Sequence, residues 1–308
     1  MPVTAATAQI SLKIGHGHTE NHSFHLAIQK FQEALEKRAP GEFTVAVFAN
    51  SQLGTEREMQ EQLATGTLEM TLTGVLATYE PKITLLELPY LFRDREHIKK
   101  AQASEAVQKL AAGLPAKGVR LVGFLENGFR NITDSIRPIN NPADVKGLTI
   151  RTPENLAQIE TFRALGASPT PMAFSELYAA LRQGVVDGQE NPLENISDGK
   201  LFEVQKYLAL THHIYNSAYF LVSESFYQSL TEVQRKALQE AVKEASDWQM
   251  DYVANREAEL LESLKKAGMQ VSEPNQDEFK AATAPVYDAF YQKFGNDARE
   301  FVKAIQAL

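Results

Sequence analysis

Residues 231–268 read TEVQRKALQEAVKEASDWQMDYVANREAELLESLKKAG, and this stretch decides the architecture. Thr231 and Gln234 have the spacing of a capping box, and no proline or glycine follows until Gly268, where glycine commonly ends a helix. The pattern predicts one helix of about 36 residues, ~54 Å long at 1.5 Å per residue. A small lobe is only ~30 Å across and the heptad spacing is not kept, so we expect the helix to lie across two lobes rather than project as a coiled coil.

The segments before this helix alternate strands and helices. Apolar alternation predicts strands at 10–14, 43–48 and 68–72, separated by helices at 23–37 and from Thr55 to about 65, where Glu58 completes a second capping box. This order predicts a parallel sheet with right-handed crossovers. The remaining expected elements are a helix at 95–113, strands at 119–124, 148–150, 208–211 and 218–223, polar loops at 126–131 and 212–216, and a strand at 269–271 followed by two helices.

The composition is that of a globular protein with two lobes. The chain has 308 residues, 44% of them apolar and 23% charged, which is too long for one ordinary core. A net charge of −8 argues against a nucleic-acid partner, and no apolar run approaches the ~18 residues of a membrane span. The absence of cysteine excludes disulfides and thiolate metal sites. Residues 1–9 resemble the end of a secretory leader, so we expect a flexible remnant left after signal-peptide removal, although a plain flexible terminus would look similar.

Arg151 is the first candidate binding residue. It ends the expected strand 148–150 just before a proline turn. Ligands of open α/β sheets bind outside the carboxyl ends of strands, and a guanidinium offers a planar fork of donors that matches a carboxylate. A surface arginine that caps a strand is the simpler alternative.

Several motifs in order carry a family resemblance. They are 50–54 (NSQLG), 88–90 (LPY), 146–151 (KGLTIR), 166–175 (GASPTPMAFS) and 186–192 (VDGQENP). The chain resembles the solute-binding subunit of a tripartite ATP-independent periplasmic (TRAP) transporter of the DctP type, which includes sialic-acid-binding members. The resemblance implies a two-lobed α/β fold, like that of periplasmic binding proteins, with mixed sheets, crossing strands and one long shared helix. It places residues 10–128 and about 216–253 in lobe I, and residues 129–215 and about 254–308 in lobe II.

The resemblance also implies a function. The protein would be a periplasmic monomer that captures a carboxylate-bearing solute between its lobes and delivers it to the TRAP membrane permease subunits, which a sodium gradient drives. Arg151 would pair with the ligand carboxylate, with Arg130 near the same group and Asn191 orienting both arginines. Phe174 would pack against the ligand. The residues that would also line the cleft are Glu56, Glu154, His213 and Asn216.

A physical argument supports this set, because a buried carboxylate must be paired and two arginines with an amide supply enough donors. Simpler explanations exist for single members. Arg130 could form a structural salt bridge, Phe174 could pack in the core, and Asn216 could serve turn chemistry.

The ligand's far end is expected to differ from sialic acid. Where the sialic-acid members carry an acidic and a basic residue, the chain reads LTGVLA at 72–77, and its first loop supplies His16, His18 and Glu20. A polar loop of this kind favours a six-carbon sugar acid, such as a uronate, aldonate or keto-aldonate. C4-dicarboxylates and other organic acids remain alternatives.

Two other readings are weaker. His16, His18, His22 and His25 suggest a metal site, but no cysteine completes a ligand set, and we expect neither metal nor cofactor. An enzyme acting on a sugar acid would need catalytic groups, and the chain has no phosphate loop, dinucleotide fingerprint or Gly-x-Ser-x-Gly. We therefore expect no catalytic residues. A structural or signalling ectodomain would share the two-lobed design.

Overall fold

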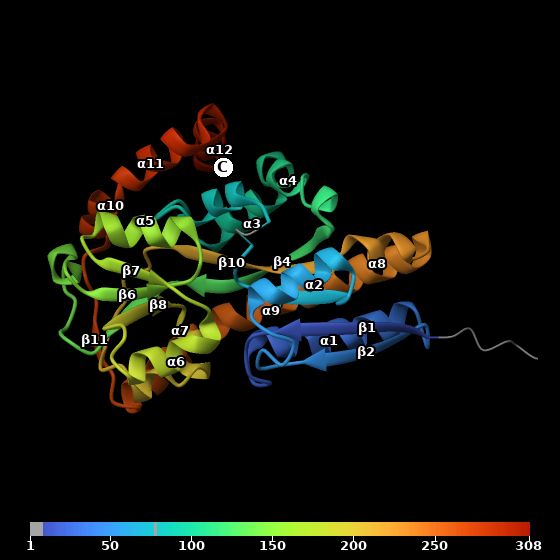
Figure 1. Ribbon diagram of the computed structural model, residues 1–308, viewed down its shortest axis with the longest axis horizontal. Helices are drawn as coiled ribbons and strands as arrows, with labels where there is room; N and C mark the ends of the chain where they lie inside the picture. The colour runs from blue at the N-terminus through green and yellow to red at the C-terminus, as the bar shows by residue number, and fades with distance from the viewer. Residues whose placement is uncertain (1–8, 77–78) are drawn as a thin grey trace, which may run out of the picture. The chain divides into compact units, whose positions relative to one another are not determined.

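The computed structural model of the protein describes residues 9–76 and 79–308. It shows the expected α/β fold, with two mixed sheets and one long helix (Figure 1). The expectation for the N-terminal remnant falls on residues outside the described range, apart from Gln9, and so does Ala77 of the LTGVLA motif. No helix in the described part of the chain is long and apolar enough to cross a bilayer.

The first sheet contains the predicted parallel strands. Its order is β2 (Phe43–Phe48), β1 (Ile10–His16), β3 (Met70–Thr73), β10 (Tyr215–Ser223) and β4 (Val119–Phe129). β1 pairs in parallel with β2 and β3, while β10 is antiparallel to β3. The connecting helices are α1 (Ser23–Arg38) and α2 (Glu56–Thr65), and α1 turns an apolar stripe that includes Phe24, Ile28, Phe31 and Leu35 into the core.

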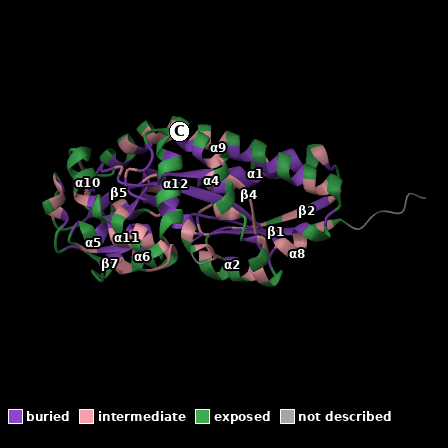
Figure 2. Cartoon of the chain, turned by 90° about the horizontal axis from the view of Figure 1, so that it is seen from above, coloured by how far each residue is buried: buried purple, intermediate pink, exposed green. Residues whose placement is uncertain are grey.

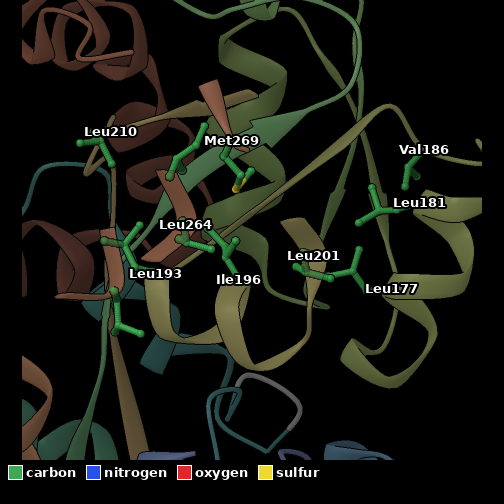
Figure 3. Close-up of a cluster of buried hydrophobic side chains, with 11 residues drawn as sticks. Leu177, Leu181, Val186, Leu193, Ile196, Leu201, Leu210, Leu264 and Met269 are labelled. Carbon is green, nitrogen blue, oxygen red and sulfur yellow. The ribbon is translucent and has the colours of Figure 1, made fainter. Parts of the chain in front are cut away.

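The second sheet holds short strands, several of them polar. Its order is β11 (Gln270–Ser272), β9 (Tyr207–Ala209), β5 (Asn131–Asp134), β8 (Gly188–Asn191), β6 (Thr149–Thr152) and β7 (Ser168–Pro171). The helices between these strands are α5 (Leu156–Ala164), α6 (Phe174–Arg182) and α7 (Leu193–Asp198). Figure 3 shows the apolar cluster beneath α6 and α7, where Leu177, Ile196 and Leu264 are fully or almost fully buried.

Four expectations about the elements are wrong in detail. The helix at 95–113 is two helices, α3 (Arg95–Ala103) and α4 (Glu105–Ala111), because Ser104 caps α4 by accepting the Val107 N–H. The loop 126–131 is mostly strand, since β4 runs to Phe129 and β5 begins at Asn131. The loop 212–216 ends early because β10 begins at Tyr215. Three helices rather than two follow β11: α10 (Gln276–Thr283), α11 (Pro285–Phe294) and α12 (Asn296–Gln306).

The long helix α9 (Glu232–Lys266) has 35 residues, close to the expected length. Its capping box is present, with the Thr231 N–H donating to Gln234 Oε1 at 2.9 Å and the Gln234 N–H donating to Thr231 Oγ1 at 3.3 Å. Buried and exposed residues alternate along its length (Figure 2). The remaining helical turns are η1 (Pro81–Glu87), η2 (Pro115–Lys117), η3 (Pro142–Val145), η4 (Leu201–Glu203) and α8 (Glu224–Ser229).

The chain divides into two compact units. The first contains residues up to 73 with 115–125 and 219–252, and the second contains 74–114, 126–218 and 253–308. Three of the boundaries fall within β4, β10 and α9, so these elements supply residues to both units. Residues 74–114, expected in lobe I, group with the second unit, and the exact lobe boundaries stay a prediction.

Gly188 allows β8 to lie between β5 and β6. A Cβ atom at this position would lie 2.3 Å from the Thr133 carbonyl oxygen. Gly188→Ala should therefore force the strands apart and lower the free energy of unfolding by about 1–3 kcal/mol, measured by urea denaturation. Gly113→Ala is the matched control, because its Cβ would meet nothing closer than Glu80 Oε2 at 3.5 Å. Equal stability of the two variants would contradict this packing argument.

Candidate ligand-binding site

Strand ends in the second sheet gather polar residues at one edge. β5 and β8 are antiparallel, with Asn131 opposite Asn191, and β8 is parallel to β6, with Gln189 opposite Arg151. The start of β5 and the carboxyl ends of β6 and β8 therefore share this edge. It is the type of position where α/β sheets bind ligands.

Arg130 lies between β4 and β5 and forms a buried ion pair with Glu190 of β8. Its Nε donates to Glu190 Oε2, and its Nη2 donates to Glu190 Oε1 at 2.8 Å. Nη2 also donates to the Glu190 carbonyl oxygen at 2.6 Å. Arg130 is 2% exposed and Glu190 is fully buried. The salt-bridge alternative for Arg130 is thus what the structure shows, and Glu190 is its partner.

His213 is a neutral side chain that forms a hydrogen bond with Glu190. Burial would raise the pKa of Glu190, but the Arg130 charge and the hydrogen bonds from His213 and Arg130 outweigh burial and hold the pKa below its usual range. Burial lowers the pKa of His213, although Glu190 opposes that shift. With Glu190 ionised and His213 neutral, Nε2–H donates to Glu190 Oε2 at 3.2 Å, and the Thr211 hydroxyl donates to Nδ1 at 2.8 Å.

Two asparagines extend the network around the Arg130 guanidinium. Arg130 Nη2 donates to Asn191 Oδ1 at 3.1 Å, and Arg130 Nη1 donates to Asn216 Oδ1 at 3.0 Å. Asn216 Nδ2 donates in turn to the Gly74 carbonyl oxygen at 3.2 Å. Asn191 Nδ2 donates to Gln189 Oε1 at 2.5 Å. One hydrogen-bonded cluster therefore contains Arg130, Asn191, His213 and Asn216, and the role of these residues in ligand binding stays a prediction.

Arg151 is buried at the end of β6. Its exposed fraction is 2%, so the alternative of a surface arginine is wrong. Nε and Nη2 both donate to the Met172 carbonyl oxygen, at 3.1 and 2.6 Å. Met172 follows the end of β7, whereas Arg151 lies near the end of β6. The plane of the guanidinium is therefore fixed between the ends of these two strands.

The other expected residues of the second unit occupy different environments. Phe174 begins α6, is partly buried, and packs against the apolar cluster of Figure 3, which supports its core-packing alternative. Glu154 is exposed one residue before Asn155, which caps α5. Asn216 lies in β10 rather than in a turn.

The expected residues of the first unit lie at the end of β1, in the loop after it, and at the start of α2. Glu56 begins α2 and accepts a hydrogen bond from the Thr73 hydroxyl at 2.9 Å. His18 is buried and stacks on His22, with ring centroids 3.9 Å apart. Glu20 is exposed. His16 Nε2 and His25 Nδ1 are hydrogen-bonded at 3.1 Å. The roles of these residues in ligand binding stay predictions.

The residue that sequence reasoning missed is Glu190. It lies inside the 186–192 motif, and in the structure it is a charged side chain within four successive buried residues, Gly188–Asn191. Burial of these residues is not visible in the sequence because they lack an apolar pattern.

Glu190→Gln should destabilise the protein by about 3–5 kcal/mol at neutral pH, because it leaves Arg130 buried without its counter-charge. The Glu190 pKa lies below the ordinary 4.5, so its stabilising effect is present above that pH and is lost as pH falls through the lowered value. The difference between wild type and variant should therefore shrink in acid.

Urea denaturation at about pH 7 and about pH 3 measures this difference. Glu160→Gln is the control, since Glu160 forms only a surface pair with Arg163. A Glu190 variant no less stable at neutral pH than the control would show that the pair is dispensable.

Comparison with known proteins identifies the family. Residues 14–293 match the family described as bacterial extracellular solute-binding protein, family 7. The 2,3-diketo-L-gulonate-binding periplasmic protein of Escherichia coli is 34% identical over 305 residues, covering 98% of this chain and 90% of that protein.

Solved structures agree in fold. A TRAP periplasmic solute-binding protein from Polaromonas, bound to D-erythronate, is 38% identical with a TM-score of 0.93, over 97% of this chain and 99% of that chain. A second, from Roseobacter denitrificans with bound L-galactonate, is 34% identical with a TM-score of 0.89, over 96% and 98%. The chain therefore belongs to the family 7 extracellular solute-binding proteins, the DctP family of TRAP transporters.

Proposed function

We propose that the protein is the periplasmic solute-binding subunit of a TRAP transporter and binds an organic acid through Arg151. The observation that carries this proposal is the buried Arg151 guanidinium, held in one plane by the Met172 carbonyl at the carboxyl end of β6. A fixed fork of this kind matches a carboxylate in two hydrogen bonds and loses little entropy on binding. As in the family, the protein would act as a monomer and pass its ligand to the membrane permease subunits.

The proposed ligand is a six-carbon sugar acid. Support for the six-carbon length comes from two similar proteins, which bind L-galactonate and 2,3-diketo-L-gulonate, and a third binds the four-carbon sugar acid D-erythronate. All three combine a carboxylate with a chain of hydroxyl or keto groups. The polar first loop with His18 and Glu20, and the hydroxyl of Thr73 beside Glu56, offer groups suited to hydroxyls.

The proposed role is binding without catalysis. The imidazole of His213 has both nitrogens in hydrogen bonds, to Thr211 and Glu190, and its pKa is lowered by burial. Glu190 is engaged by Arg130. These groups are arranged to hold one another, whereas a general base needs a free acceptor within reach of its substrate proton.

A thermal-shift screen tests the substrate class. Galactonate, gulonate, glucuronate, galacturonate and a C4-dicarboxylate such as succinate are compared at equal concentration. Sugar acids should raise the melting temperature more than succinate, since a ligand that binds only the folded state stabilises it. NMR of the mixture should show the sugar acid unchanged. A larger shift with succinate would assign a dicarboxylate, and turnover would overturn the transport role.

Arg151→Ala should raise the Kd of the best sugar acid by at least about 30-fold, which corresponds to ~2 kcal/mol. Arg151→Lys should also bind poorly, because a point charge does not replace the planar fork. Calorimetry measures both, and circular dichroism confirms that each variant is folded. Arg163→Ala is the control, because Arg163 is an exposed arginine of the same unit. Wild-type affinity in Arg151→Ala would refute the carboxylate role.

A further inference from the structure

Glu87 is a buried carboxyl group that the proposed binding role does not use. It ends η1 and is 1% exposed. Gln158 Nε2 donates to its Oε2, and its Oε1 has no hydrogen-bond partner among the described residues. A carboxylate is costly to bury with so few donors, because desolvation disfavours its charged form.

The helix packed against η1 supplies no positive charge to Glu87. α5 presents Gln158 and Thr161 three residues apart on one face, after the capping residue Asn155. Gln158 Oε1 and Thr161 Oγ1 are also buried without a hydrogen-bond partner in the described part of the chain, while the Asn155 side chain acts on Glu87 as a neutral donor. The surroundings are thus polar but neutral.

The charged groups that act on Glu87 from further away are Arg130 and Glu190. The Arg130 guanidinium already bonds both carboxylate oxygens of Glu190. The positive charge of Arg130 therefore acts on two buried carboxyl groups, those of Glu87 and Glu190, and the neutral His213 adds no charge. If Glu87 were ionised, the cluster would carry an uncompensated negative charge in a low-dielectric environment.

Three cations on η1 and on the helices around it have partners other than Glu87. Lys82 of η1 bonds Asp297 of α12 at 2.6 Å, and Lys109 bonds Glu105 within α4 at 2.8 Å. On α5, the charged side chains Glu160 and Arg163 bond each other at 2.6 Å. Each of these pairs has exposed side chains, so none neutralises the buried carboxyl group.

We propose that Glu87 holds a proton in the ligand-free protein at neutral pH, and that loss of this proton weakens binding of an anionic ligand. Ionised Glu87 would add a second negative charge that acts on Arg130 and Glu190. Glu190 follows Gln189, which pairs with Arg151 across β8 and β6, so the added charge would repel an acid bound at Arg151. The second half rests on the proposed function, because it needs an acid as the ligand. The first half stands on Glu87 alone.

Burial agrees with this assignment, since it raises the pKa of Glu87 to about 8 from an ordinary 4.5. The folded protein then holds this proton more tightly than the unfolded chain. The stabilising effect of the proton is fully present below about pH 4.5 and is lost as pH rises to about 8. In Glu87→Gln the side chain is neutral at every pH, so its contribution to the free energy of unfolding does not change with pH.

The first experiment titrates Glu87 without ligand and without a variant. Carbon-13 NMR follows its side-chain carboxyl resonance, which is assigned through the bonded carbons to the backbone amide of residue 87. We expect the resonance to titrate near pH 8, as burial predicts. A midpoint below about pH 6 would overturn the proposal, because Glu87 would then be ionised at neutral pH.

The second experiment compares melting temperatures of wild type, Glu87→Gln and Glu160→Gln between about pH 5 and pH 9. Glu87→Gln should gain stability relative to wild type as pH rises to about 8 and then stay level. Glu160→Gln, a surface change on the adjacent helix, should show no such trend. A pH-independent difference between Glu87→Gln and wild type would count against the buried proton.

The third experiment measures the Kd of L-galactonate from about pH 7.5 to pH 9.5. In wild type, Kd should rise by up to about tenfold per pH unit above about pH 8, and Glu87→Gln should remove this dependence. The same pH dependence in both proteins would overturn the coupling. If L-galactonate does not bind at any pH, the sugar-acid assignment and the coupling fail together, while the NMR titration still decides the protonation of Glu87.

Discussion

The buried ion pair between Arg130 and Glu190 is the interaction on which the candidate site depends. Both charged groups are buried, so they have lost their hydrogen bonds to water. Two hydrogen bonds from the Arg130 guanidinium to the Glu190 carboxylate replace part of that hydration. Removing either charge leaves the other buried alone. The pair therefore ties the start of β5 to the end of β8.

Two amide side chains hold the ion pair between Arg130 and Glu190 in place. Asn191 and Asn216 each accept a bond from Arg130 and each donate onward, to Gln189 and to the Gly74 carbonyl. Reorientation of any of these groups costs free energy, because it would leave a buried polar atom without a hydrogen bond. Side chains held by such bonds within the protein have less conformational entropy to lose on binding.

Sequence patterns predicted the elements that have strong local signals and missed those that depend on distant partners. Capping residues and the lack of glycine located α9, and apolar alternation located β1 and β2. β5 and β8 have polar sequences, Asn-Ile-Thr-Asp and Gly-Gln-Glu-Asn, so they resembled loops, and their burial comes from neighbouring strands. Likewise, Arg130 was recognised as a candidate, but its partner is 60 residues away and no local pattern connects them.

The two buried arginines have different hydrogen-bond partners within the fold. Arg130 bonds a carboxylate of the protein itself, so its positive charge is largely balanced within the fold. Arg151 donates to the Met172 carbonyl oxygen through Nε and Nη2, which fixes the orientation of its guanidinium. An incoming acid would have to displace Glu190 to pair fully with Arg130, at the cost of stranding a buried carboxylate. We therefore propose that Arg130 mainly holds the strand ends that present the site, and that direct recognition of the acid rests with Arg151.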